Sequence, residues 1–511
     1  MVLKSFVKKS VIAGVTIWLS MFSAVAQIKQ LTLSINPGKT YQTIDNFGAS
    51  DAWACQFVGN WPDDKKNKIA DLLFSDENYA DGSPKGIGLS MWRFNVGAGS
   101  AEQGKASGIR DEWRRAESFL DADDTYNWNK QAGQVWFLKA AKKRKVPQFL
   151  GFTNSPPVKY TINGKAYANR GKINIAPEHY ADFASYLARV IQGVEKISKV
   201  KFNYISPVNE PQWDWSDGGQ EGCPYTNAEI AGLVKAIDKT FIAGNVHSKI
   251  IIGEAGSINY LFTKGDKPGK GYQINDFFKA ASPGYLGNLP SVAPAITAHS
   301  YFTTSPMTAS VKARKALADS VDKISGLTFW QSEYCILGDN AGEINGSHRD
   351  LGIDAALYMA SVIHTDLTVA NASAWQWWTA ISAYDYKDGL IYIDKNKTDG
   401  NFYTSKMLWV LGNYSRFIKP GAKRIDVSLS KADLKKPLLI SAYKNKRGLA
   451  VVIVNQNSED MDITLDTNDG KIKFTTSYTT SATDGLKAAT IAKSAVVVKA
   501  RSVMTLSGKF K

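Results

Sequence analysis

The chain of 511 residues is 44% hydrophobic and 21% charged, so it can bury a large domain core and a smaller one, and a disordered protein is excluded. Its net charge is +15, but the basic run at 142–145 ends a helical pattern and no nucleic-acid-binding motif accompanies it. We therefore expect no nucleic-acid partner. The chain has three cysteines, Cys55, Cys223 and Cys335, which are too few for a disulfide-rich scaffold. The sequence leaves open which two of them, if any, form a disulfide.

Residues 1–26 have the pattern of a signal peptide. Lys4, Lys8 and Lys9 precede the apolar run Val11–Phe22, and small residues at 24–26 form a cleavage site before Gln27. The apolar run is too short for a convincing membrane-spanning helix, and no second long run follows. We expect an exported protein, periplasmic or extracellular, without a membrane span after processing.

Residues 27–45 predict a short pair of strands around Asn36-Pro37-Gly38. Strand-like and helical patterns then alternate through residues 46–418. The predicted strands are Ile44–Ser50, Gly88–Val96, Gln148–Asn154, Phe202–Asn209, Lys249–Glu254, Ala295–Phe302, Leu327–Glu333 and Ala372–Thr379. Predicted helices between them include 69–74, 135–141, 180–194, 228–241, 311–324 and 353–363. This α/β alternation predicts a (β/α)8 TIM barrel with long loops.

Residues 419–511 have a different sequence pattern. Lys419-Pro420-Gly421 interrupts the chain, and short alternating runs separated by Asn, Asp, Gly and Lys turns follow. This is typical of an antiparallel β-sandwich, which we expect the N-terminal strands to join.

Two predicted barrel strands end in a glutamate. Pro211 closes the fourth strand and leaves Glu210 at its rim, and Glu333 lies on the inward row of the seventh. An isolated Asn-Glu-Pro is a weak signal, and a glutamate near a strand end is often a solvated surface residue. Because the carboxyl ends of barrel strands form one face, however, both carboxylates are predicted there, where they could flank a glycosidic bond.

Other predicted strand ends carry polar or aromatic groups suited to a sugar. We expect substrate contacts from Asp51, Arg93, Asn154, His299, Tyr301 and Trp377, and from Trp213 or Trp215 in the loop 212–225. Packing in the core or at the rim is an equally good explanation for any single tryptophan. The chain lacks HExxH, paired CxxC, GxSxG and P-loop motifs, so we expect no metal and no cofactor.

The ordered motifs Phe-Gly-Ala-Ser-Asp (47–51), Trp-Arg-Phe-Asn (92–95), Ser-Pro-Pro (155–157), Asn-Glu-Pro (209–211), His-Ser-Tyr (299–301) and Ser-Glu-Tyr (332–334) resemble glycoside hydrolase family 30 over about residues 45–420. The resemblance implies that Glu210 is the general acid/base and Glu333 the nucleophile of a retaining enzyme. It also implies that Asn209 binds the sugar 2-hydroxyl and that Arg93 and Tyr301 hold the nucleophile, which should favour its ionised form.

Within that family, GIGLSMWRFNVGAGS, FTNSPPVKYTINGKAYAN and SPVNEPQWDWSDGGQEGCPY are most similar to the endo-β-1,6-galactanase branch. The resemblance therefore implies an endo-acting enzyme that cleaves β-1,6-galactan chains, and we expect it to be a monomer. Many relatives carry Trp where this chain has Asn154, which leaves other substrates open: β-1,6-glucan, xylan, or an exo-cleaved galactoside or fucoside. A non-catalytic carbohydrate-binding protein is the alternative from another class.

Overall fold

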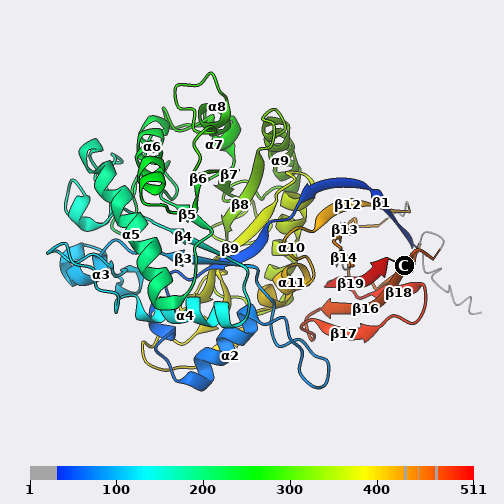
Figure 1. Cartoon of the computed structure of the whole chain (residues 1–511). Helices are drawn as coiled ribbons and strands as arrows, with labels where there is room; N and C mark the ends of the chain where they lie inside the picture. Colours follow the sequence, from blue (N-terminus) through cyan, green and yellow to red (C-terminus); the bar gives the residue numbers. More distant parts are fainter. Residues whose placement is uncertain (1–30, 431–433, 447, 467–469, 511) are drawn as a thin grey trace, which may run out of the picture.

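Two β-sheets organise the chain, one closed into a barrel and one forming a separate domain beside it (Figure 1). The structure, a computed structural model, describes residues 31–430, 434–446, 448–466 and 470–510. The predicted signal peptide at 1–26 lies outside the described residues. Among the residues that are described, no helix combines the length and hydropathy needed to cross a bilayer.

The first sheet is an eight-stranded parallel barrel. Its strands are β2 (Asn46–Ser50), β3 (Met91–Asn95), β4 (Gln148–Phe152), β5 (Tyr204–Ser206), β6 (Lys249–Ala255), β7 (Val292–His299), β8 (Thr328–Tyr334) and β9 (Ala374–Ser382). They pair in chain order, and β9 closes the ring by pairing with both β2 and β8. Nearly every residue in these strands is buried, which explains their near-continuous apolar runs. The TIM barrel predicted from the sequence is confirmed.

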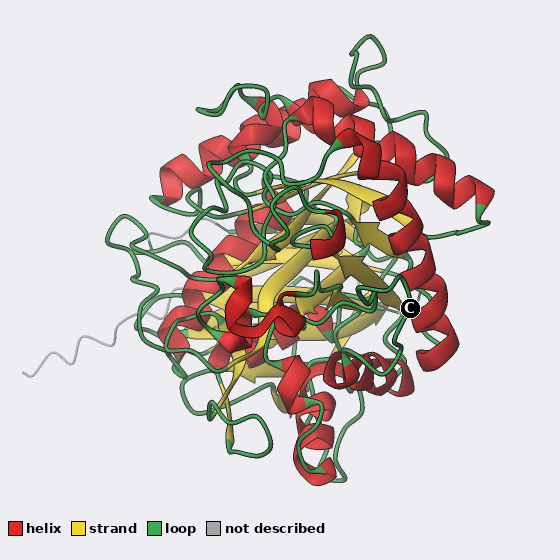
Figure 2. Cartoon of the chain, turned by 90° about the vertical axis from the view of Figure 1, so that its left-hand side faces the viewer, coloured by secondary structure: helices red, strands yellow, loops and turns green. Residues whose placement is uncertain are grey.

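Helices surround the barrel strands (Figure 2). The longer ones are α2 (Asp63–Phe74), α4 (Ala132–Lys143), α5 (Tyr180–Ser198), α6 (Asn227–Ala243), α9 (Met307–Val321), α10 (Ile353–Thr368) and α11 (Lys406–Ser415). Short helices α1 (Cys55–Val58), α3 (Ser100–Gln103), α7 (Asn259–Phe262) and α8 (Gln273–Phe278) lie in the connections. A capping box fixes the start of α6: the Thr226 side chain accepts from the Glu229 amide while the Glu229 carboxylate accepts from the Thr226 amide.

Two strands that the sequence did not predict extend the barrel sheet. β10 (Gly389–Ile393) pairs in parallel with the end of β9, and β11 (Phe402–Thr404) pairs with β10 in the antiparallel sense. Both follow the eighth barrel strand, where long loops were expected.

The second sheet has nine strands in the order β17-β16-β19-β14-β13-β12-β1-β15-β18. Its members are β1 (Leu31–Thr43), β12 (Lys423–Leu429), β13 (Leu439–Lys444), β14 (Leu449–Asn455), β15 (Met461–Leu465), β16 (Ile472–Thr480), β17 (Lys487–Thr490), β18 (Ala495–Val498) and β19 (Ser502–Phe510). All pairings are antiparallel except that of β1 with β15. The predicted C-terminal β-sandwich is confirmed, and so is the expectation that the N-terminal segment joins it.

The N-terminal segment differs in one respect from the prediction. Residues 31–43 form one strand rather than a pair, with register shifts against β12 between Asn36 and Thr40 and between Thr40 and Thr43. The Asn36 side chain accepts from the Gly38 amide at 3.1 Å. The turn-like sequence is therefore accommodated as an irregularity within a strand instead of reversing the chain.

Strand β14 joins the two domains through its alternating faces. Val451 and Ile453 point into the core of the sandwich, whereas Val452 and Val454 belong to the core of the barrel. On the same boundary, Asn413 of α11 donates to the Tyr478 carbonyl and to the Thr505 hydroxyl, both at 3.0 Å. The sandwich is thus packed against barrel helices.

Candidate active site

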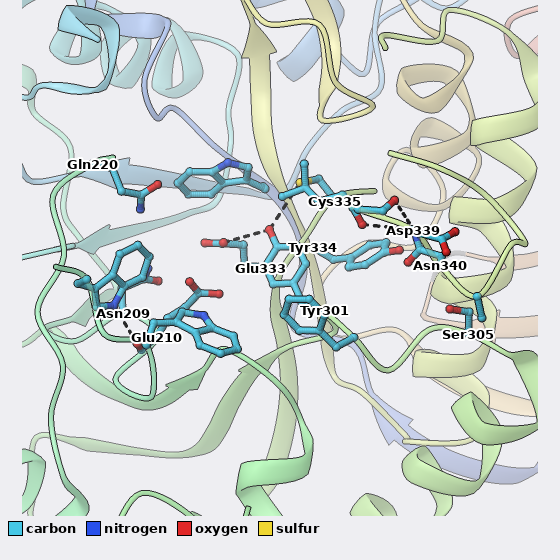
Figure 3. Close-up of a pocket in the computed structure, with 17 residues that line it drawn as sticks. Asn209, Glu210, Gln220, Tyr301, Ser305, Glu333, Tyr334, Cys335, Asp339 and Asn340 are labelled. Atoms are coloured by element: carbon cyan, nitrogen blue, oxygen red, sulfur yellow. Dashed lines mark hydrogen bonds between the residues drawn. The ribbon is translucent and has the colours of Figure 1, made fainter. Parts of the chain in front are cut away.

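Two glutamates face each other at the carboxyl end of the barrel. Glu210 follows β5 and is 8% exposed, and Glu333 lies near the end of β8 and is 4% exposed. One carboxylate oxygen of each lies within 4.8 Å of the other and of a ring nitrogen of His299. Figure 3 shows both carboxylates directed into the same cavity. The structure thus brings together two residues that are 123 positions apart in the sequence.

Arg93 and Tyr301 hold the carboxylate of Glu333. Arg93, at the centre of β3, is fully buried, and its Nη1 donates to Glu333 Oε2 at 2.5 Å. The Tyr301 hydroxyl donates to Glu333 Oε1 at 3.2 Å, as Figure 3 shows. Arg93 Nη2 also donates to Asn209 Oδ1 at 3.2 Å. One guanidinium thereby fixes both Glu333 and the amide of Asn209 beside Glu210.

His299 connects Glu210 to a third buried carboxylate. Its Nδ1 lies 2.9 Å from Glu210 Oε1, and its Nε2 lies 3.0 Å from Glu254 Oε2 at the end of β6. The same Glu254 oxygen accepts from Arg93 at 3.2 Å and from Ser332 at 3.1 Å. Three carboxylates and two basic groups therefore form one buried network under the mouth of the barrel.

The backbone at the two strand ends is unusual. Glu210 and Glu254 both have a φ of +43°, a left-handed conformation that side chains seldom adopt, and the Glu210 amide donates to the Glu254 carbonyl at 2.9 Å. Gly253 precedes Glu254 with a φ of +112°, and a Cβ there would lie 2.4 Å from the Thr297 carbonyl oxygen. Only glycine fits this close approach, which turns Glu254 inward.

A cavity of about 580 Å³ opens above the carboxylates, within the size range of ligand sites. The loop after β5 contributes Trp213, Trp215 and Gln220 to its lining, as the sequence predicted for the segment 212–225. The Trp215 indole donates to the Glu210 carbonyl at 3.0 Å, which ties this loop to the acid-bearing strand end. In the view of Figure 3, Gln220 lies at one end of the cavity and Ser305 and Asn340 lie at the other.

Comparison with known proteins identifies this constellation. Residues 30–392 match O-Glycosyl hydrolase family 30, and residues 421–506 match the Glycosyl hydrolase family 30 beta sandwich domain. The chain belongs to glycoside hydrolase family 30. A curated endo-beta-1,6-galactanase from Hypocrea rufa is 23% identical over 419 residues, covering 79% of this chain and 78% of that protein.

Solved structures agree with this family assignment. A conserved exported protein from Bacteroides fragilis has a TM-score of 0.87 and 35% identity, with 93% of this chain and 100% of that chain covered. The catalytic domain of GH30 xylanase C from Talaromyces cellulolyticus has a TM-score of 0.67 and 21% identity over 94% and 100% of the chains, a likeness of fold alone. The protein is thus a glycoside hydrolase, and its substrate is a carbohydrate.

The electrostatics of this family 30 site differ from the sequence expectation in one respect. Burial raises the pKa of Glu333 above its usual range, although His299 and Arg93 oppose that effect. Burial also disfavours the charge of His299, yet the carboxylates around it raise its pKa to about 10. Glu254 behaves oppositely to Glu333, because Arg93 and His299 overcome its burial and hold its pKa below the usual value. The contacts with Arg93 and Tyr301 therefore do not bring the pKa of Glu333 below its usual value.

His299 also limits what this site can hold. The nearest atoms of Glu210, His299 and Glu333 have a spacing that could surround a cation. However, both His299 nitrogens face carboxylates, which raise its pKa to about 10, so a metal would have to displace a firmly held proton at neutral pH. The arrangement suits proton transfer rather than metal binding.

Five predicted substrate contacts lie outside the lining of the cavity: Arg93 and His299, which are buried in the network beside the two glutamates, and Trp377, Asp51 and Asn154. Trp377 is fully buried, and its indole donates to the Asp388 carbonyl at 2.6 Å. Its neighbour Trp378 lines the cavity instead, because successive side chains of a strand point to opposite faces. Asp51 is 1% exposed, burial raises its pKa to about 8, and it accepts from the Asn95 amide. Asn154 is 2% exposed and donates to the Asn95 side chain at 3.3 Å.

Sequence reasoning missed several residues of the site. Glu254 ends an apolar strand as Glu210 and Glu333 do, so the signal was present, but the flanking Gly253 and Ala255 are neither polar nor aromatic. Phe302 lines the cavity and is 79% exposed. It directly follows Tyr301 near the end of an apolar run, where the sequence does not distinguish a phenylalanine at the rim from one in the core. The three cysteines are buried and unpaired, and Cys335 lines the cavity with its sulfur 3.6 Å from the Tyr301 hydroxyl.

Proposed function

We propose that the protein is a retaining glycosidase in which Glu210 is the general acid/base and Glu333 the nucleophile. The observation that carries this proposal is the approach of the two carboxylates to within 4.8 Å at the nearest oxygens. Retaining enzymes hold their carboxyl groups about 5–5.5 Å apart, whereas inverting enzymes leave about 6.5–9.5 Å for a water. The spacing favours direct attack by a carboxylate.

The contacts support the following role for each group. Glu333, held by Arg93 and Tyr301, attacks the anomeric carbon as the bond to the leaving oxygen breaks, and Glu210 gives that oxygen its proton. A water then attacks the glycosyl ester, Glu210 takes its proton, and Glu333 leaves as a carboxylate. We propose that Asn209, which Arg93 orients, hydrogen-bonds the 2-hydroxyl of the bound sugar.

For the substrate we propose an endo-acting enzyme on β-1,6-galactan. The support is the 23% identical endo-beta-1,6-galactanase together with a cavity rim that presents aromatic rings on which sugars stack. Phe302 is 79% exposed there and packs edge-on against Trp213 with ring centroids 5.7 Å apart. β-1,6-Glucan, xylan, and exo-cleavage of galactosides or fucosides are the alternatives within the family. A purely carbohydrate-binding protein is less supported, because both glutamates and their partners are in place.

Export, domain organisation and oligomeric state are also proposals. We propose that residues 1–26 are removed on export, that residues 46–418 and 419–511 act as catalytic barrel and β-sandwich domains, and that the enzyme works as a monomer on poly- or oligosaccharide. The likeness to an exported protein from Bacteroides fragilis supports export.

Product analysis tests the substrate. Purified enzyme would be incubated with β-1,6-galactan, β-1,3-galactan, β-1,6-glucan and glucuronoxylan, and the products separated by size over time. We expect a ladder of oligosaccharides from β-1,6-galactan alone. Cleavage only of xylan or glucan would overturn the galactanase proposal and leave the family intact. Release of a single small product would favour exo-action, and binding without cleavage would favour a lectin-like role.

A further inference from the structure

The segment that carries Tyr301 lies beyond the end of its strand. β7 ends at His299, which the sheet holds in register opposite Glu333 of β8. Tyr301 and Phe302 follow in a turn outside the sheet, yet the Tyr301 hydroxyl meets Glu333 at 3.2 Å (Figure 3). Phe302 has a φ of +61°, a left-handed conformation that is unfavourable for so large a side chain. Contacts from outside the sheet must therefore hold this segment.

An ion pair between two barrel helices supplies such contacts. Arg314 of α9 and Asp366 of α10 are both fully buried, and Nε of the arginine lies 2.6 Å from Oδ1 of the aspartate. Arg314 Nη1 donates to the Thr303 carbonyl at 2.5 Å. The Ser300 hydroxyl donates to Asp366 Oδ2 at 3.2 Å. The ion pair thus anchors the chain on both sides of the turn at 301–302.

Further hydrogen bonds fix the two anchors to the barrel. Asp366 Oδ2 also accepts from the Trp375 indole of β9 at 2.9 Å. The Thr303 hydroxyl donates to the Ser300 carbonyl at 2.8 Å, which closes the turn on itself. The Ser300 amide donates to the Glu333 carbonyl at 3.3 Å. The segment is therefore attached to α9, α10 and β8 by residues whose side chains do not line the catalytic cavity.

We propose that Arg314 and Asp366 are positioning residues for the nucleophile. They hold residues 300–303 so that the Tyr301 hydroxyl stays hydrogen-bonded to Glu333. A buried ion pair returns little net stability, because the desolvation of its charges offsets their attraction, so stability alone does not account for this one. A reacting side chain must be kept close to its productive geometry, which depends on the residues that support it. The inference rests on the catalytic roles proposed above and deepens them by naming what keeps the nucleophile's contact in place.

Single substitutions remove one anchor at a time. Ser300→Ala deletes the hydroxyl that meets Asp366. Arg314→Lys keeps the charge but gives up the planar fork that meets both Asp366 and the Thr303 carbonyl. For each variant we expect kcat on the glycan that the native enzyme cleaves to fall by about tenfold, the factor for one hydrogen bond to a charged group. Melting curves would confirm that each variant folds.

A double-mutant cycle separates positioning from a general loosening of the barrel. Tyr301→Phe removes the hydroxyl that meets Glu333 and keeps the ring. If the anchors act through that hydroxyl, Ser300→Ala should lower kcat by about tenfold in the native background but by less than about twofold in Tyr301→Phe. Equal losses in the two backgrounds, or no loss in the native one, would overturn the positioning role. Arg314→Lys enters the same cycle, with the same expectation, if Ser300→Ala does not fold.

Asp238 supplies a matched control at the other end of the same strand. It lies on α6, is 6% exposed, and its Oδ1 accepts from the Ser291 amide at 2.9 Å, directly before β7 begins at Val292. Asp238→Asn should leave kcat unchanged, because the residues that it holds lie at the opposite end of the barrel from the carboxylates. A loss of kcat as large as that of Ser300→Ala would show that any loosening of β7 lowers activity, and would overturn the proposal.

Crystal structures distinguish a failure of this inference from a failure of the catalytic proposal. If the native enzyme cleaves no glycan, the catalytic roles fall, and the contact itself is measured instead. In the native protein the Tyr301 hydroxyl should lie within hydrogen-bonding distance of Glu333 Oε1, as it does at 3.2 Å here. In Ser300→Ala the same two atoms should lie beyond hydrogen-bonding distance. An unchanged contact in that variant would overturn the role of the anchors.

Discussion

The barrel mouth and the sandwich interior bury their side chains in opposite ways. At the mouth, Arg93 and His299 and three glutamates are all buried within one hydrogen-bonded network. The sandwich core is built from apolar residues such as Leu33, Val451 and Leu506. The desolvation cost of buried charges offsets most of their attraction, so the network at the mouth contributes little to stability and serves catalysis. The apolar core of the sandwich contributes mainly to stability. Substitutions in the two regions should therefore affect different quantities.

The largest effect should come from the two facing glutamates. Glu333→Ala should lower kcat by at least about 1,000-fold with little change in melting temperature, because it removes the nucleophile. Azide should then give an inverted glycosyl azide with an activated substrate. Glu210→Ala should keep a burst on good leaving groups and give a retained azide product. The opposite stereochemistry for the two variants, read by proton NMR, would show that the roles are exchanged.

Glu254→Gln should have the next largest effect. It removes a charge that holds the imidazolium of His299, and a hydrogen bond to a charged group contributes about 1.5–3 kcal/mol, so kcat/KM should fall by about 10- to 100-fold. The carboxylates raise the pKa of His299 to about 10, so losing one must lower it. The alkaline limb of the pH profile of kcat/KM should therefore move to lower pH. An unchanged profile with reduced activity would instead indicate loose packing.

Ile453→Val should lower stability and leave activity unchanged. Ile453 is fully buried in the sandwich core on β14, and removing one methyl group there should cost about 1 kcal/mol of unfolding free energy. Because that face of β14 points away from the barrel, kcat should stay unchanged. Denaturant melts and initial rates would check both. A loss of kcat without a loss of stability would contradict the division of labour between the domains.

Phe302→Ala should have the smallest effect. The ring is exposed at the cavity rim and supports no core, so stability should hold. Loss of a stacking surface should raise KM for polymer by about three- to fivefold, which corresponds to about 1 kcal/mol, and leave kcat nearly constant. Phe302→Tyr, which keeps the ring, is the matched control. Equal KM values for the two variants and the native enzyme would exclude a sugar platform at this position.

Much of the architecture was predictable because periodicity repeats along the chain. Eight apolar runs alternating with helical stripes define the barrel, and two of those runs end in Glu210 and Glu333. What could not be predicted depends on backbone detail. The run at 375–378 contains three tryptophans, and only the direction in which the alternating side chains of this strand point decides that Trp378 rather than Trp377 reaches the cavity. Likewise, the turn-like residues 36–38 do not reveal that β1 continues through them.

The position of β1 in the sheet determines when this protein can finish folding. Its inward residues Leu31 and Leu33 are made before any barrel strand, yet β1 pairs with β12 and with residues 461–465 of β15, which are made only after the whole barrel. Until then the segment has an open hydrogen-bonding edge, a template for pairing between chains. A gene truncated after the barrel would therefore yield a protein with an orphaned strand at its start, and an isolated barrel would need trimming at both ends.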